Sequence, residues 1–289
     1  MGEAKQRRSF SQRIKEDQPY CVFCGGDSPS ETVEHYPPRS IFDGKHRPKG
    51  MEFGACKECN EASREADLVV AMLSRMMPDS KTEAGRSEVK RLINSALRIP
   101  GLSKEVRPEW DQLGTLLRYR DIADQLPTWK FLRIDGPIVA RSMTIFGSKL
   151  GLALHRATTG RILSPSGVIG IQWYSNLQAY QDALPKEFLA MCGPGKTLRQ
   201  GSFEVGDQFR VASVVPDNSG LMSGHFAIFR ESFAILMFAT EEPEDAHKGW
   251  SVSPGFLKRP LTVLPVQETQ ADKGLRPSSS PKVTREFGA

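Results

Sequence analysis

The feature that most restricts the fold of this chain is a set of four cysteines near its N-terminus. They form two Cys-x-x-Cys pairs, C-V-F-C at 21–24 and C-K-E-C at 56–59, and 31 residues separate the pairs. Two such pairs can place four thiolates at the corners of one tetrahedron, which is the geometry of a structural zinc site. The sequence therefore predicts zinc bound by Cys21, Cys24, Cys56 and Cys59.

Other polar residues accompany the cysteines. Glu34 and His35 come before a double proline and Arg39, and Asn60 directly follows the last cysteine. A zinc knuckle alone requires none of these residues. The pattern over residues 18–70 resembles the zinc-supported HNH endonucleases, which have a ββα-metal active site. In that family an Asp/Glu-His pair ends the first strand, and a His or Asn follows the last cysteine at the start of the helix.

The resemblance implies a role for each of these residues. His35 would be the general base, because the pKa of histidine lies near neutrality. Glu34 and Asn60 would complete the catalytic set and hold Mg²⁺ or Mn²⁺, since hard cations prefer oxygen ligands. Arg39, Arg64 and Lys57 would contact the nucleic acid. Asp67, two turns beyond Asn60, could also face the site, but we assign it to the solvated face of the helix.

The chain departs from the family pattern at one position. Residues 36–59 contain no asparagine, so the family's middle asparagine has no counterpart here. Another group must then orient His35, with His46 or a backbone carbonyl as candidates. This departure supports a second hypothesis, a non-catalytic, zinc-dependent nucleic-acid-binding protein on a degenerate HNH scaffold. A zinc-stabilised protein-interaction module is a third hypothesis, but it leaves Glu34 and His35 unexplained.

The predicted fold class is α+β, with an N-terminal ββα-metal (HNH) zinc module followed by helices and a mixed, mainly antiparallel α+β domain. We expect a zinc ion to replace the core that so small a module lacks. The expected regions are a basic arm that is either disordered or a short helix (1–18), the zinc module (19–78), a helical connection (79–127), an α+β domain of unknown role (128–265) and a disordered tail (266–289). The expected helices are 56–77, 82–99, 137–158 and 176–191, and the expected strands are 31–35, 51–55, 129–134, 168–173, 208–215 and 223–239, the last with a turn at 230–232.

Composition limits the remaining possibilities. The 289 residues include 39% hydrophobic and 25% charged residues, with no apolar run long enough for a membrane span and no secretory signal, so we expect a cytoplasmic protein without a membrane partner. The net charge of +5 permits binding to a polyanion, with DNA expected before RNA. A protein partner or regulatory ligand is the expected use of the C-terminal region. We expect His155, His225 and Cys192 to be core residues.

Overall fold

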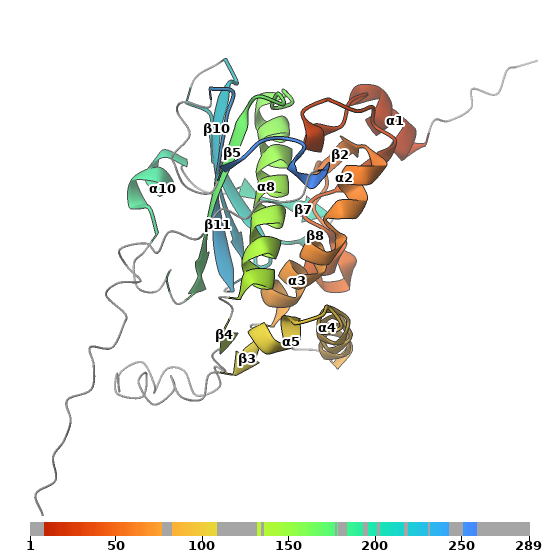
Figure 1. The fold of residues 1–289 in the computed structure, drawn as a ribbon, viewed down its shortest axis with the longest axis vertical. Coiled ribbons are helices and arrows are strands. Elements are labelled where there is room, and N and C mark those ends of the chain that lie inside the picture. Colours follow the sequence, from red (N-terminus) through yellow and green to blue (C-terminus); the bar gives the residue numbers. More distant parts are fainter. Residues whose placement is uncertain are drawn as a thin grey trace, which may run out of the picture.

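The computed structural model describes residues 9–76, 83–108, 132–133, 136–176, 178, 184–192, 196–200, 203–216, 219–230, 232–242 and 251–258. The predictions for residues 1–8, for most of the connection before 132 and for the tail lie outside these residues. The architecture is α+β, with helices and antiparallel sheets, as predicted from the sequence. Helix α8 (Pro137–Thr159) runs between the large sheet and the N-terminal, cysteine-bearing part of the chain (Figure 1).

The N-terminal part begins with a helix, α1 (Phe10–Asp17), which a capping box of Ser9 and Gln12 initiates. The two predicted strands are present as β1 (Thr32–His35) and β2 (Glu52–Ala55), and they pair antiparallel with Glu34 opposite Phe53. Two short 3-10 turns lie in the loop that joins them, η2 (Arg39–Ile41) and η3 (Asp43–Lys45).

The helix expected over 56–77 is instead two helices, α2 (Lys57–Ala62) and α3 (Arg64–Arg75). The break falls at Ser63, which is fully buried and whose hydroxyl hydrogen-bonds with Asp67 and with Lys149 of α8. Two further helices follow, α4 (Glu83–Ala96) and α5 (Leu102–Glu105). The Glu105 carboxylate accepts hydrogen bonds from the first backbone N–H groups of α8, which fixes the start of that helix.

The large sheet has six strands in the order β12-β5-β11-β10-β9-β6, and every neighbouring pair is antiparallel. The strands are β5 (Val168–Ser175), β6 (Lys196–Thr197), β9 (Arg210–Val214), β10 (Met222–Phe229), β11 (Phe233–Thr240) and β12 (Ser251–Val252). The minor elements are β3 (Arg107–Pro108), β4 (Leu132–Arg133), β7 (Arg199–Gln200), β8 (Phe203–Glu204) and the 3-10 helices η1 (Val22–Cys24) and η5 (Phe256–Lys258).

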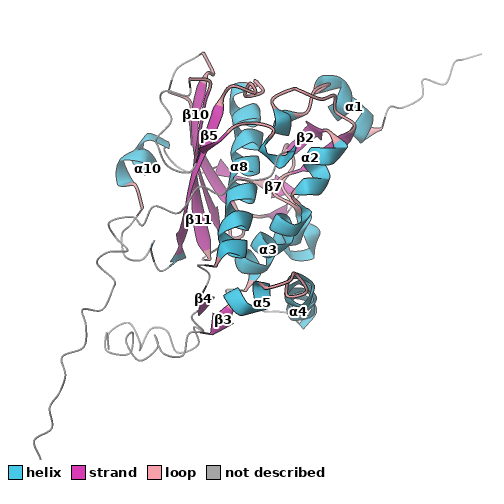
Figure 2. Cartoon of the chain, viewed as in Figure 1, coloured by secondary structure: helices cyan, strands magenta, loops and turns pink. Residues whose placement is uncertain are grey.

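The helix expected over 176–191 is not continuous, because Leu184 and Pro185 are not helical. Helix α10 (Lys186–Cys192) begins directly after Pro185, a residue that cannot donate a helical hydrogen bond. It lies on the side of the sheet away from α8 (Figure 2).

Helix α8 is buried along most of its length because both of its sides are covered. One side packs on β5, β10 and β11, and the other contacts α3 and η1. Gly151 allows the close approach to the sheet, since a Cβ there would come within 2.5 Å of the Ile169 side chain.

The cysteine-bearing part and the sheet therefore share one continuous hydrophobic core. The ring of Tyr36, in the loop after β1, lies 5.2 Å from that of Phe146 on α8. This corrects the expectation that zinc replaces a missing core, because the module obtains its core from α8 and the sheet.

A charge network built on two largely buried arginines joins the same two parts at a second place. Asp43 Oδ1 accepts hydrogen bonds of 2.9 Å from Arg75 of α3 and from Arg230 in the β10–β11 turn. Arg75 also pairs with Glu88 of α4 at 3.0 Å. The loop between β1 and β2 is thus attached to both the helices and the sheet.

Candidate functional site

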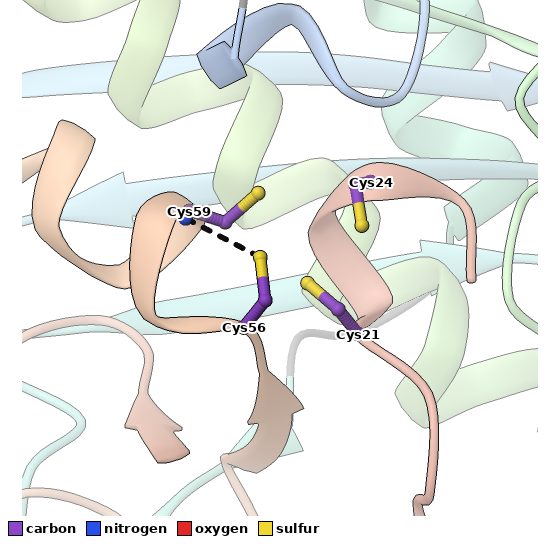
Figure 3. Close-up of side chains that lie close together, drawn as sticks. All are labelled: Cys21, Cys24, Cys56 and Cys59. Carbon is purple, nitrogen blue, oxygen red and sulfur yellow. Dashed lines mark hydrogen bonds between the residues drawn. The ribbon is translucent and has the colours of Figure 1, made fainter. Parts of the chain in front are cut away.

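The four cysteines of the two Cys-x-x-Cys pairs come together as predicted. Their sulfur atoms all lie within 4.8 Å of one another, and all four residues are buried (Figure 3). Cys21 immediately precedes η1, and Cys24 is the last residue of η1. Cys56 caps the start of α2, and its sulfur accepts a 3.5 Å hydrogen bond from the backbone N–H of Cys59. Four soft donors around one point fit a closed structural zinc site.

The local turn that makes this possible depends on Gly25. Its φ of 69° is in the left-handed region, and a Cβ there would lie 2.8 Å from the backbone nitrogen of Pro165. The chain can therefore turn back after Cys24 while it packs closely on the loop after α8.

The thiols interact strongly with one another. Hydrogen bonds from Cys21 and Cys59 lower the pKa of Cys24 far below its usual range, whereas hydrogen bonding with Cys24 raises the pKa of Cys21 to about 12. Closely packed thiols thus concentrate negative charge on part of the cluster, which a divalent cation would compensate and distribute.

Glu34 lies on β1, and its carboxylate is buried and ion-paired. Only 9% of its side chain is exposed, and its Oε1 lies 3.3 Å from Nζ of Lys149, whose side chain is fully buried on α8. The ammonium group also donates a 2.6 Å hydrogen bond to Ser63 and lies 5.0 Å from the ring centre of Phe23 and 4.9 Å from that of Tyr36. Burial raises the pKa of Glu34 to about 7, although Lys149 acts in the opposite direction.

Asp67 belongs to the same buried group, which corrects its assignment to the solvated face of a helix. Its carboxylate accepts hydrogen bonds from the hydroxyls of Tyr36 at 3.0 Å and Ser63 at 2.8 Å. Burial raises its pKa, and the charge of Lys149 partly opposes that rise. No local pattern indicates this burial, because the groups that meet Asp67 come from Tyr36, 31 residues away, and from Lys149 of α8.

His35 is at the end of β1 and, by the alternation of a strand, faces away from Glu34. Its side chain is 27% exposed, and its Nδ1, 4.0 Å from Glu52, has no hydrogen-bond partner among the described residues. Burial and, to a smaller extent, the positive charges of Arg47 and Arg39 together lower the pKa of His35 to about 4. His35 is therefore a neutral imidazole beside two guanidinium groups.

The remaining predicted residues surround β1 and α2. The Asn60 amide donates to Thr32 at 3.0 Å, so Asn60 contacts the same face of β1 as Glu34, at a position two residues before Glu34. Arg64 is exposed at the start of α3, 3.7 Å from Glu61, and Lys57 is exposed at the start of α2.

A hard cation does not fit beside Glu34 in this arrangement. The ligand oxygen that such an ion would use already faces the Lys149 ammonium, which is buried and anchored by Ser63. A divalent ion next to a buried ammonium would be strongly repelled, because charges interact more strongly where water is excluded. The Mg²⁺ or Mn²⁺ ion expected at Glu34 and Asn60 stays a prediction that this ion pair disfavours.

The three residues expected in the core are buried. His155 of α8, Ser223, His225 and Ser213 form a chain of hydrogen bonds of 2.8, 2.9 and 2.8 Å, in that order. Cys192 is buried at the end of α10. The histidines thus have structural partners within the sheet.

Comparisons of the chain with family models, with curated proteins and with solved structures found no match in any of the three. Within the described residues, none of the helices combines the length and apolar character that crossing a membrane would require.

Proposed function

We propose that this protein is an HNH-type endonuclease that hydrolyses phosphodiester bonds, with DNA as its expected substrate. The support is the order and placement of the parts. A two-stranded hairpin leads directly into helix α2, four cysteines hold the two ends of the hairpin, and the Glu34-His35 pair ends the first strand.

The observation that carries the proposal is the environment of His35. A neutral imidazole can accept a proton from water, and the charges of Arg39 and Arg47 beside it would attract a phosphate group. An imidazole with a pKa of about 4 is a weak base, but a bound phosphate would offset the two arginines and raise that value towards neutrality.

In this proposal the zinc ion is structural. The four thiolates would hold it in a closed site, and its contribution is to fix the turn before β1 to the start of α2. The hydrolytic step would belong to His35, with Arg39, Arg64 and Lys57 contacting the nucleic acid around it.

A second candidate function is nucleic-acid binding without cleavage, on the same scaffold. The ion pair between Glu34 and Lys149 favours it, since the pair occupies the carboxylate that the family would use for its cation. The basic residues would then retain their contacts with phosphate while the chemistry is lost.

Supercoiled plasmid incubated with zinc-loaded protein separates the two candidates. The reactions contain Mg²⁺, Mn²⁺ or a chelator too weak to remove the zinc, and they compare the wild type with His35→Ala and with the surface control Lys104→Ala. Nicking by the wild type and Lys104→Ala that disappears in His35→Ala, at equal zinc content, supports the endonuclease.

Salt-dependent binding of plasmid, single-stranded DNA and RNA without any cutting would instead support the binding protein. Equal cutting by the wild type and His35→Ala would contradict the assigned role of His35.

A further inference from the structure

The C-terminal part of the described chain returns to the cysteine cluster. After β12, at the edge of the large sheet, residues 253–258 cross to the N-terminal part, where the backbone N–H of Gly255 donates to the carbonyl of Phe23 at 3.1 Å. Helix η5 contacts both η1 and α2, the two elements that supply the cysteines. Figure 1 shows this segment in blue beside α2, and Figure 3 shows its ribbon next to the cysteine side chains.

Lys258, the last residue of η5, fixes this contact through its side chain. Its ammonium group donates a 2.6 Å hydrogen bond to the Ser28 hydroxyl and lies 3.4 Å from Oδ2 of Asp27. Both partners are in the turn that follows Cys24. Only 18% of the Lys258 side chain is exposed, so the ammonium is held against the knuckle rather than in bulk water.

A zinc ion bound by four thiolates keeps a net charge of about −2. Partial burial acts to lower the pKa of Lys258, but the negative charge of Cys24 and Cys56 outweighs this effect and raises it above the usual range. The ammonium group is thus held on the turn that directly follows the ligand Cys24, in a segment that contacts both cysteine-bearing elements, so its charge opposes that of the cluster.

We propose that Lys258 is a positioning residue for the zinc site. Its positive charge offsets the excess negative charge of the zinc–thiolate cluster, and its anchorage holds η5 over that cluster. Zinc bound by residues 21–59 is consequently retained by a residue 199 positions beyond the last ligand, Cys59. This inference is independent of the proposed nuclease activity.

The test is the rate at which the full-length, zinc-loaded protein releases zinc to a chromogenic chelator. It is measured well below the unfolding temperature, for the wild type, Lys258→Arg, Lys258→Met and Lys258→Glu, with exposed Lys104→Glu as the matched control. Zinc content before the reaction and the melting temperature of each variant are measured alongside.

We expect zinc to be released faster as the side chain at position 258 becomes less positive. Lys258→Glu releases zinc roughly tenfold faster than the wild type and Lys258→Met falls between them, while Lys258→Arg and Lys104→Glu match the wild type. Added salt slows Lys258→Glu towards Lys258→Met, because it screens the introduced repulsion.

Equal rates in the wild type, Lys258→Met and Lys258→Glu would overturn the proposal. So would equal acceleration in Lys258→Arg and Lys258→Glu, since packing alone would then explain the effect. If Lys258→Glu does not fold, the comparison of Lys258→Met with Lys258→Arg decides the question by the same criterion.

Discussion

The ammonium group of Lys149 lies 3.3 Å from a carboxylate oxygen of Glu34, in a position from which water is almost excluded. The two residues come from opposite halves of the chain, from the central helix and from the first strand of the cysteine-bearing hairpin. The electrostatics of the candidate site therefore depend on the C-terminal half of the protein.

Lys149→Met should destabilise the protein by about 3 kcal/mol at pH 8, because it leaves the buried Glu34 and Asp67 without a cation. Urea unfolding measures the loss, and Lys104→Met should change stability by less than about 0.5 kcal/mol. The double variant Glu34→Gln/Lys149→Met should be more stable than Lys149→Met alone. A double variant that loses the sum of both single effects would show that the pair is not coupled.

Glu34 should also affect the pH dependence of stability. Its pKa is raised from 4.5 to about 7, so the folded state binds more protons than the unfolded state between these values. Glu34 therefore lowers stability as pH rises from 4.5 to 7, and the penalty is fully present above pH 7. Replacing it by glutamine should remove this component, which is seen as a more positive slope of unfolding free energy against pH. An unchanged slope would show that the carboxylate is not buried as described.

His225 should act in the opposite direction. Burial lowers its pKa from 6.5 to about 3, so the unfolded state binds the extra proton and stability falls as the pH drops from 6.5 towards 3. At pH 5 the cost is about 2 kcal/mol. Between pH 7 and pH 5, the unfolding free energy of His225→Gln should therefore fall by about 2 kcal/mol less than that of the wild type, as measured by urea unfolding. A loss identical to the wild type would place the acid sensitivity elsewhere, with His155→Gln as the next variant to measure.

Zinc should be a stoichiometric part of the fold. We expect one equivalent in the purified protein by metal analysis, and none in Cys59→Ala, whose melting temperature should be far below that of the wild type. Cys192→Ala is the matched control, since Cys192 is also buried but lies on α10, away from the cluster. Loss of zinc in Cys192→Ala, or retention in Cys59→Ala, would contradict the assigned ligands.

The sequence predicted those features that local patterns encode. The spacing of the cysteines indicated the cluster, alternation indicated the hairpins, and apolar periodicity with Gly160 as its end indicated helix α8. The break at Ser63 could not be predicted in this way, because it depends on hydrogen bonds to Asp67 and to a residue 86 positions away.

The environment of the candidate site could not be predicted from local patterns either, because it also depends on contacts between residues far apart in the sequence. Lys149 lies in an apolar helix where nothing local indicates a partner, yet it determines the state of Glu34. Asp67 is read as a solvated charge unless the fold is known. Residues that act through long-range contacts carry no local signal, and here they include the ones that decide which chemistry is available.

The return of residues 253–258 to Phe23 has a consequence for synthesis on the ribosome. The cysteines leave the exit tunnel early, but the helix and the C-terminal segment that complete their surroundings follow much later. The apolar side of the nascent hairpin stays uncovered until the residues up to 258 have been made. Translation that stops before residue 258 would therefore leave a metal-binding segment that chaperones and proteases can recognise.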